Sequence, residues 1–332
     1  MKAKRLVGLG KVTIVVLVLL MTASLSFGGD SRSAIRTIVP ELWLEVESPN
    51  SGVMLESPNF DREGNLYVTD AWEGKIYKIS SDKKIKVIYN SHGKLPCSSL
   101  DVHKDGRLFV TTLTGGKIIA MNPDGTGITD IVTNYNGYPL YAPDDLVFAS
   151  DGSFYFTDIG PTSAEPAGKV YHVSSDFKTV TLLVDHVDGP NGISLKPGER
   201  GLWVGCYKEN SVIEINLMKD RKSLVHLFEV LHIHYFNGCY GPDSNYIDSE
   251  GNLYQALYKQ GKFAILNNGG ILVAEILIPG RDEGKFIFST ATTMKPGTNE
   301  TFCVASGPKG KGGACIWKYR GLAKAMTPFS HQ

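Results

Sequence analysis

The stretch FDREGNLYVTD (residues 60–70) decides the fold, because five variants of it follow along the chain. It reads as the end of one strand, a turn containing glycine, and a second strand with alternating apolar side chains, which is the pattern of a β-hairpin. The other copies are VHKDGRLFVTT (102–112), VFASDGSFYFTD (147–158), SLKPGERGLWVGC (194–206), YIDSEGNLYQAL (246–257) and MKPGTNETFCVAS (294–306).

The spacing of these copies predicts the architecture. The turn glycines stand at positions 64, 106, 152, 198, 251 and 297, and every copy is followed by a further strand such as GKIYKIS (74–80). A repeat of this length with several strands is typical of one blade of a propeller. A β-sandwich or two small β domains would not explain six copies without a linker between them. The sequence therefore predicts an all-β, six-bladed β-propeller over residues 31–332.

The first 30 residues differ from the repeats. Lys2, Lys4, Arg5 and Lys11 precede an uncharged run over residues 12–27, which is the charge order of an export signal or N-terminal anchor. The run is short for a membrane span of about 20 residues. We therefore expect an exported protein, periplasmic or extracellular, whose only membrane attachment is this segment if it is retained.

Composition excludes some classes of function. The chain has 34 basic and 34 acidic residues in 332, so no excess of positive charge points to nucleic acid. Its five cysteines are few and odd in number, which does not fit a disulfide framework. Cys303 and Cys315 could face each other across a hairpin, but buried free thiols are the favoured interpretation. Nucleophile-elbow, zinc-protease and phosphate-loop motifs are absent from the sequence.

The repeats also bring polar residues together. The innermost strands of all blades begin at the same end of the central channel, so residues at the same place in each repeat converge there. The position eleven residues before the central aromatic of each hairpin, or twelve in the fourth repeat, is polar: Glu56, Ser98, Asp144, Asn191 and Asp243. In the sixth repeat the position falls within residues 291–293.

Three carboxylates at one channel mouth need a neutralising charge. Ligands that are oxygen atoms only suit Ca²⁺, Mg²⁺ or Mn²⁺, whereas Zn²⁺ favours His or Cys. The sequence therefore predicts a divalent cation, with Ca²⁺ preferred, on the propeller axis. His232 and His234 alternate just before the segment of Asp243, which suggests that they line the same pocket.

Several segments carry a family resemblance. LESPNFD (55–61), APDDLVF (142–148), GPNGISL (189–195) and GPDSNYIDSEGNLY (241–254) resemble the gluconolactonase and senescence marker protein family of six-bladed propellers. Within it, HKDGRLFV (103–110), FYFTD (154–158) and IPGRDEG (278–284) are similar to its Ca²⁺-dependent, drug-responsive bacterial lactonases.

The resemblance implies roles for individual residues. Glu56, Asp144, Asn191, Asp243 and Ser244 match the metal ligands, and Asp243 matches the catalytic acid. Asp145 is expected to orient Asp144, or to be a turn residue. A second Ca²⁺ site would involve Gly116, Asn136 and Tyr141, but Asn136 and Pro139 replace an expected acid and hydroxyl, so we do not expect this site to form.

The function implied is hydrolysis of a small-molecule lactone, with the cation polarising the carbonyl and Asp243 moving the proton. Two alternatives stay open. One is an arylesterase or phosphotriesterase resembling paraoxonases, and the other is a propeller that binds a ligand without turnover.

Overall fold

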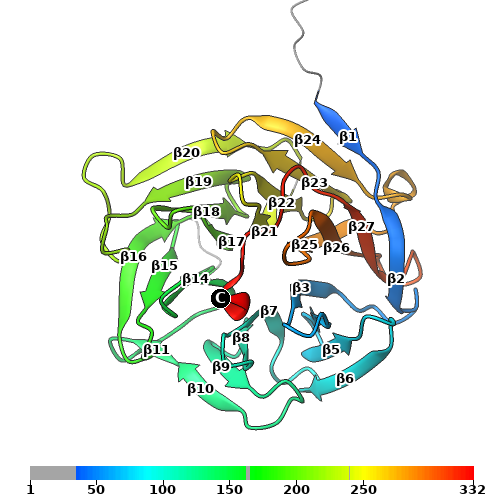
Figure 1. Cartoon of the computed structure of the whole chain (residues 1–332), viewed down its shortest axis with the longest axis horizontal. Helices are drawn as coiled ribbons and strands as arrows, with labels where there is room; N and C mark the ends of the chain where they lie inside the picture. The colour runs from blue at the N-terminus through cyan, green and yellow to red at the C-terminus, as the bar shows by residue number, and fades with distance from the viewer. Residues whose placement is uncertain (1–34, 162–164, 239) are drawn as a thin grey trace, which may run out of the picture. The chain divides into compact units, whose positions relative to one another are not determined.

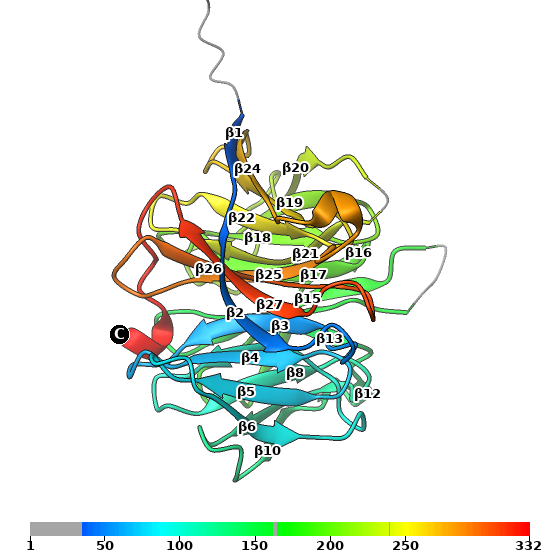
Figure 2. The same cartoon turned by 90° about the vertical axis from the view of Figure 1, so that its right-hand side faces the viewer.

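The computed structural model describes residues 35–161, 165–238 and 240–332, and Ile35–Gln332 forms one compact unit. Six antiparallel sheets of four main strands each surround a central axis, as Figure 1 shows face on and Figure 2 from the side. The predicted six-bladed β-propeller is confirmed. The expected export segment, residues 1–30, lies outside the described residues.

The first three blades follow the chain from the axis outward. Blade 1 comprises β3 (Leu55–Phe60), β4 (Leu66–Asp70), β5 (Lys75–Ile79) and β6 (Ile85–Asn90). Blade 2 comprises β7 (Cys97–Val102), β8 (Leu108–Thr112), β9 (Lys117–Met121) and β10 (Thr129–Val132). Blade 3 comprises β13 (Pro143–Phe148), β14 (Phe154–Asp158), β15 (Gly168–Val173) and β16 (Val180–Val187). A small hairpin, β11 (Asn134–Tyr135) and β12 (Tyr138–Pro139), lies between blades 2 and 3 in the chain.

The last three blades repeat this order. Blade 4 comprises β17 (Pro190–Leu195), β18 (Gly201–Cys206), β19 (Ser211–Asn216) and β20 (Val230–Tyr235). Blade 5 comprises β21 (Pro242–Ile247), β22 (Leu253–Leu257), β23 (Lys262–Leu266) and β24 (Leu272–Leu277). Blade 6 takes three strands from the end of the chain, β25 (Phe288–Met294), β26 (Glu300–Ser306) and β27 (Ala314–Arg320). Two short 3₁₀ helices are η1 (Arg281–Glu283) and η2 (Phe329–His331).

The beginning of the described chain closes the ring. β2 (Glu41–Glu47) pairs antiparallel with β27 as the fourth strand of blade 6, with Glu41 opposite Lys318. β1 (Arg36–Ile38) adds a parallel fifth strand to blade 5, with Arg36 opposite Ala274. Because strands from both ends of the described chain complete one sheet, the six blades form a closed structure.

The hairpin pattern of the sequence supplies the core. The central aromatic of the first five hairpins has no exposed surface at all: Tyr67, Phe109, Tyr155, Trp203 and Tyr254. All six apolar clusters combine residues from neighbouring blades, so the sheets pack face to face. The turn glycines adopt positive φ, for example 80° at Gly64 and 92° at Gly106, which favours glycine at these turns.

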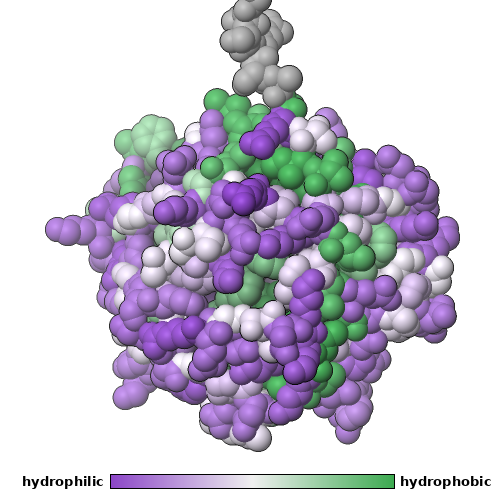
Figure 3. Space-filling view, turned by 45° about the vertical axis from the view of Figure 1, so that its right-hand side comes forward, coloured by the Kyte–Doolittle hydropathy of each residue, from purple (hydrophilic) through white to green (hydrophobic). Residues whose placement is uncertain are grey.

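The face in Figure 3 is mostly polar, with apolar side chains gathered over the edge of blade 5. Ile35, Val39 and Ile271 are exposed there. In the part of the chain that the structure describes, no helix has the length and apolar content that a membrane span requires.

Candidate functional site at the channel mouth

The predicted polar residues lie at one end of the channel. Each stands four positions before the last residue of its inner strand, and together they form what we call the mouth ring: Glu56, Ser98, Asp144, Asn191, Asp243 and Thr290. The sixth member is Thr290 rather than a residue within 291–293, because the pairing shift in β25 falls between Ser289 and Ala291. The first five are at most 8% exposed.

A β-bulge shapes every inner strand next to the ring. In all six blades the pairing register slips by one residue at this point. In blade 3, for example, Asp144 and Asp145 together lie opposite the single residue Thr157. A regular strand would turn these neighbouring side chains to opposite faces, whereas a bulge re-aims them. Both carboxylates therefore reach the channel region.

Hydrogen bonds connect the ring members of neighbouring blades. The Ser98 hydroxyl donates to Asp144 Oδ1, and Asn191 Nδ2 donates to Asp144 Oδ2 over 2.8 Å. The Asn191 amide also donates to Asp243. The amide N–H groups therefore stand between two carboxylates and partly offset their repulsion.

Two ring oxygens are left without a partner. Within the described residues, seven buried side-chain nitrogen or oxygen atoms make no hydrogen bond, and Glu56 Oε2 and Asn191 Oδ1 are among them. Buried polar atoms are nearly always paired, because an unpaired one loses its hydration without compensation. Two such acceptors at one channel end indicate a missing positively charged or donating group.

The pKa values of the ring carboxyls point the same way. Burial, and then the neighbouring carboxylates Asp243 and Asp144, raise the pKa of Glu56 well above its usual range. Burial raises the pKa of Asp144 to about 7, and burial followed by Asp144 raises the pKa of Asp243. A positive charge at the ring would reverse these shifts.

The residues fit a cation held by mixed oxygen ligands. Within residues 35–161, 165–238 and 240–332, no three Asp, Glu, His or Cys side chains alone are grouped as a metal site. Asn191 adds the unpaired amide oxygen Oδ1 to the carboxylates of the ring. Carboxylate and amide oxygens are the donors that Ca²⁺, Mg²⁺ and Mn²⁺ accept.

Ser244 and Asp145 belong to a second layer, one residue deeper in the channel. Asp145 accepts hydrogen bonds from Ser99 Oγ at 2.6 Å and from the amide of Ile193 at 3.2 Å. Ser244 Oγ bonds to the same carboxylate. Ser244 is thus engaged with Asp145 rather than with the ring.

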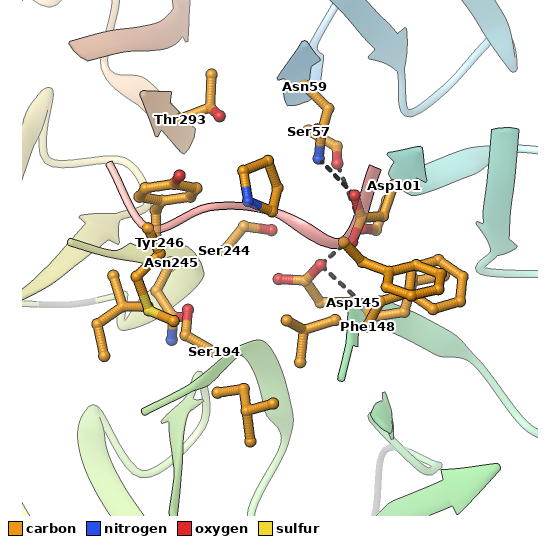
Figure 4. A pocket seen from close by; sticks show the side chains of 18 of the residues that line it. Ser57, Asn59, Asp101, Asp145, Phe148, Ser194, Ser244, Asn245, Tyr246 and Thr293 are labelled. Atoms are coloured by element: carbon orange, nitrogen blue, oxygen red, sulfur yellow. Dashed lines mark hydrogen bonds between the residues drawn. The ribbon is translucent and has the colours of Figure 1, made fainter. Parts of the chain in front are cut away.

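A cavity of about 130 Å³ lies below these two residues, and both line it. Figure 4 shows Asn59, Asp101, Ser194, Asn245 and Tyr246 on its wall. The C-terminal segment, residues 326–329 with Gln332, closes the end where the inner strands finish. There Phe329 stacks on Phe148, the last residue of β13, with ring centroids 5.3 Å apart.

Aromatic side chains that sequence reasoning missed stand at the mouth. Tyr207 and Tyr258 directly follow β18 and β22, and their amides donate to Gly189 and Gly241. Their ring centroids are 6.1 Å apart, and Tyr258 stacks on Phe288 at 5.5 Å. Burial and then Asp243 raise the pKa of Tyr207 to about 12.

These two tyrosines stand on the side of the mouth that blades 4 and 5 form. The matching positions in blades 1 and 3 are Ala71 and Ile159, whose amides make the same backbone bond. A signal for the aromatic side existed in the sequence, since Tyr207 and Tyr258 directly follow the hairpin copies that end at residues 206 and 257.

Other candidates lie elsewhere. His232 and His234 are on β20, the outermost strand of blade 4, where His232 Nδ1 is 3.4 Å from Glu209 Oε2, so the structure does not bring them to the ring. A Cβ on Gly116 would lie 2.7 Å from the Leu140 carbonyl oxygen, next to Tyr141, whereas Asn136 is in the exposed β11–β12 turn. Cys97, Cys206, Cys303 and Cys315 are free and buried.

Fold and site together define a closed propeller whose inner strands present an acidic ring at one channel end. The chain belongs to the family described as SMP-30/Gluconolactonase/LRE-like region, which it matches over residues 54–294. It is 40% identical over 308 residues to the lactonase drp35 of Staphylococcus aureus, covering 91% of this chain and 93% of that protein. It is 37% identical over 309 residues to the lactonase drp35 of Staphylococcus epidermidis, with the same coverage.

Solved structures share the fold at low sequence identity. A luciferin-regenerating enzyme superposes with a TM-score of 0.72 at 18% identity, over 88% of this chain and 98% of that one. Regucalcin from Agrobacterium tumefaciens, described as a calcium-binding protein, gives a TM-score of 0.69 at 15% identity and the same coverage. A gluconolactonase from Xanthomonas campestris gives 0.67 at 19% identity, over 85% of this chain and 94% of that one.

Proposed function

We propose that this protein is a lactonase that opens lactone esters at the mouth ring. The observation that carries the proposal is the pair of unpartnered buried oxygens, Glu56 Oε2 and Asn191 Oδ1, beside the buried carboxylates Asp144 and Asp243. Kinship with proteins named lactonase over nine-tenths of the chain supports the reaction class.

Glu56, Asp144, Asn191 and Asp243 would hold the cation, which we propose to be Ca²⁺. When bound, such a cation polarises an ester carbonyl and stabilises negative charge on its oxygen. Ser98 orients Asp144 through its hydroxyl, and Asp145 is braced by Ser99 and Ser244. Ser244 could join the ligands only by giving up its bond to Asp145.

Asp243 is the proposed proton carrier. Its carboxylate takes a proton from the attacking water, whose oxygen bonds to the lactone carbonyl carbon. It then returns that proton to the ring oxygen as the acyl carbon–oxygen bond breaks, which leaves a hydroxy acid. Tyr207 and Tyr258 stand beside it and offer an apolar wall for the rest of the substrate.

The test is hydrolysis of a panel of sugar, aliphatic and aryl-fused lactones by purified protein, followed as acid release. We expect turnover that a chelator abolishes and added Ca²⁺ restores, with Mg²⁺, Mn²⁺ and Zn²⁺ as comparison ions. No turnover of any lactone with any of these ions would reject the proposal. Turnover that a chelator leaves unchanged would reject the role of the cation but would leave the proposed lactonase activity standing.

We also propose export by the segment of residues 1–30. Its basic start and apolar run support this.

A further inference from the structure

Three threonines occupy the same place in blades 1, 2 and 3. Thr69, Thr111 and Thr157 each stand one residue before the end of the second strand, in LYVTD, LFVTT and FYFTD. All three are fully buried. They lie opposite the inner-strand segment that holds the ring position and the bulge.

Each hydroxyl reaches into the following blade. Thr69 Oγ1 donates to the Ser98 carbonyl at 3.1 Å, Thr111 Oγ1 to the Asp144 carbonyl, and Thr157 Oγ1 to the Asn191 carbonyl at 2.6 Å. In all three cases the acceptor is the main chain of the next mouth-ring residue.

Two of these hydroxyls also accept a hydrogen bond from the bulge in their own blade. Thr111 Oγ1 accepts from the Ser99 amide at 2.8 Å, and Thr157 Oγ1 accepts from the Asp145 amide at 3.1 Å. A bulge leaves an amide without its ladder partner, and a hydroxyl can donate once while accepting elsewhere. One side chain thus fixes the backbone of two neighbouring ring segments.

These bonds matter because the ring is divided among separate sheets. No strand-to-strand hydrogen bonding joins one blade to the next among the described strands. The separation between ring side chains is therefore set by packing and by the few side-chain bonds that cross between blades. The Thr111 and Thr157 bonds act directly on the residues whose spacing a cation would sense.

Blade 4 shows what replaces the threonine. Its equivalent residue is Gly205, where a Cβ would lie 2.8 Å from Pro242 Cβ and 2.9 Å from Gln255 Oε1. Gln255 Nε2 instead donates to the Asp243 carbonyl at 2.7 Å. The Asp243 carbonyl therefore also accepts a hydrogen bond from a buried side chain. In this case the donor, Gln255, belongs to the same blade as Asp243, blade 5.

We propose that Thr111 and Thr157 are positioning residues, which set the spacing of Asp144 and Asn191 for the cation. The inference rests on the proposed function, since it concerns the same ring. Removing either hydroxyl leaves a buried carbonyl and a buried amide unpaired and lets the two blades shift relative to each other.

The experiment compares Thr111→Val and Thr157→Val with Thr111→Ser, which keeps the hydroxyl. Ca²⁺ affinity is measured by calorimetry on the full chain, and the melting temperature is measured in chelator. We expect each valine variant to bind Ca²⁺ about 10-fold to 100-fold more weakly, the usual effect of losing a partner that orients a ligand. The serine variant should bind like the wild type.

Thr301→Val is the matched control. Thr301 is fully buried on β26 and donates only to the nearby Asn299 carbonyl, so its loss should not change Ca²⁺ affinity. Folded valine variants at 111 and 157 that bind Ca²⁺ as tightly as the wild type would overturn the inference and leave the proposed function intact. A wild-type protein without Ca²⁺ binding would overturn the cation site, and the inference with it.

Discussion

The two ends of the channel use similar residues but differ in how completely these are paired. At the far end, Asn59 Nδ2 donates to Asp101 Oδ1 at 3.1 Å, and Ser194 Oγ donates to Asn245 Oδ1 at 2.5 Å. At the mouth, Glu56 Oε2 and Asn191 Oδ1 have no partner. The C-terminal segment lines the cavity at the far end.

This difference separates scaffold from reactive site. Polar groups that bond to one another hold the inner strands in register and need nothing further. Unpaired acceptors among buried carboxylates leave an uncompensated negative potential, which a cation or a substrate can neutralise. The end with the unpaired oxygens, rather than the far-end cavity of about 130 Å³, is therefore where we place the chemistry.

The largest expected effect comes from Asp243→Asn. The amide keeps an oxygen of nearly the same shape but cannot take a proton from water. Lactone turnover should fall by about 10² or more, the usual range of general acid and base catalysis, while much of the Ca²⁺ is retained. Turnover and bound Ca²⁺ should be measured on the same preparation.

Asp101→Asn is the matched control, because it makes the same change at the far end of the channel. It should retain wild-type turnover. If Asp243→Asn lost activity only in proportion to its Ca²⁺, and excess Ca²⁺ restored the rate, Asp243 would be a ligand alone.

Glu56→Gln should have the next largest effect. It removes the charge of a carboxylate with an unpaired oxygen, so Ca²⁺ affinity should fall by about 10-fold or more. Calorimetry with Glu275→Gln as control measures this, since Glu275 pairs with Lys262 on blade 5, away from the mouth ring. Wild-type affinity in the Glu56 variant would remove Glu56 from the ligand set.

Much of the ring was predictable from the sequence because propeller repeats obey one register. Once a turn glycine and a buried aromatic fixed each hairpin, counting back located Glu56, Asp144, Asn191 and Asp243. The count failed only in blade 6, where a longer turn and the different position of the bulge moved the ring position to Thr290.

Two features could not be predicted from the sequence: the β-bulges of the inner strands, and the distance of each strand from the propeller axis. Alternation in a regular strand gives no reason for Asp144 and Asp145 to reach the channel together, because the bulge is not visible in one sequence. His232 and His234 are near Asp243 in sequence but lie on β20, the fourth and outermost strand of blade 4. Proximity in the chain says little when neighbouring strands run from the axis to the rim.

The smallest expected effect concerns pH and the far end. Burial, with a contribution from Asp145, raises the pKa of Asp101 to about 7, whereas an unfolded chain would have an ordinary value of about 4. The folded state therefore holds this proton more tightly, so stability from this group is present at low pH and is lost as the pH rises from about 4 to about 7. Asp101→Asn cannot ionise, and its oxygen can still accept from Asn59 and the Val102 amide. Between pH 5 and pH 8 in chelator, the wild type should therefore lose more stability, measured by urea unfolding, than this variant. Asp130→Asn, which removes a charge at the exposed edge strand β10, is the control, and its stability should change with pH as that of the wild type does. Parallel pH profiles for the wild type and Asp101→Asn would show that Asp101 is already ionised at pH 5.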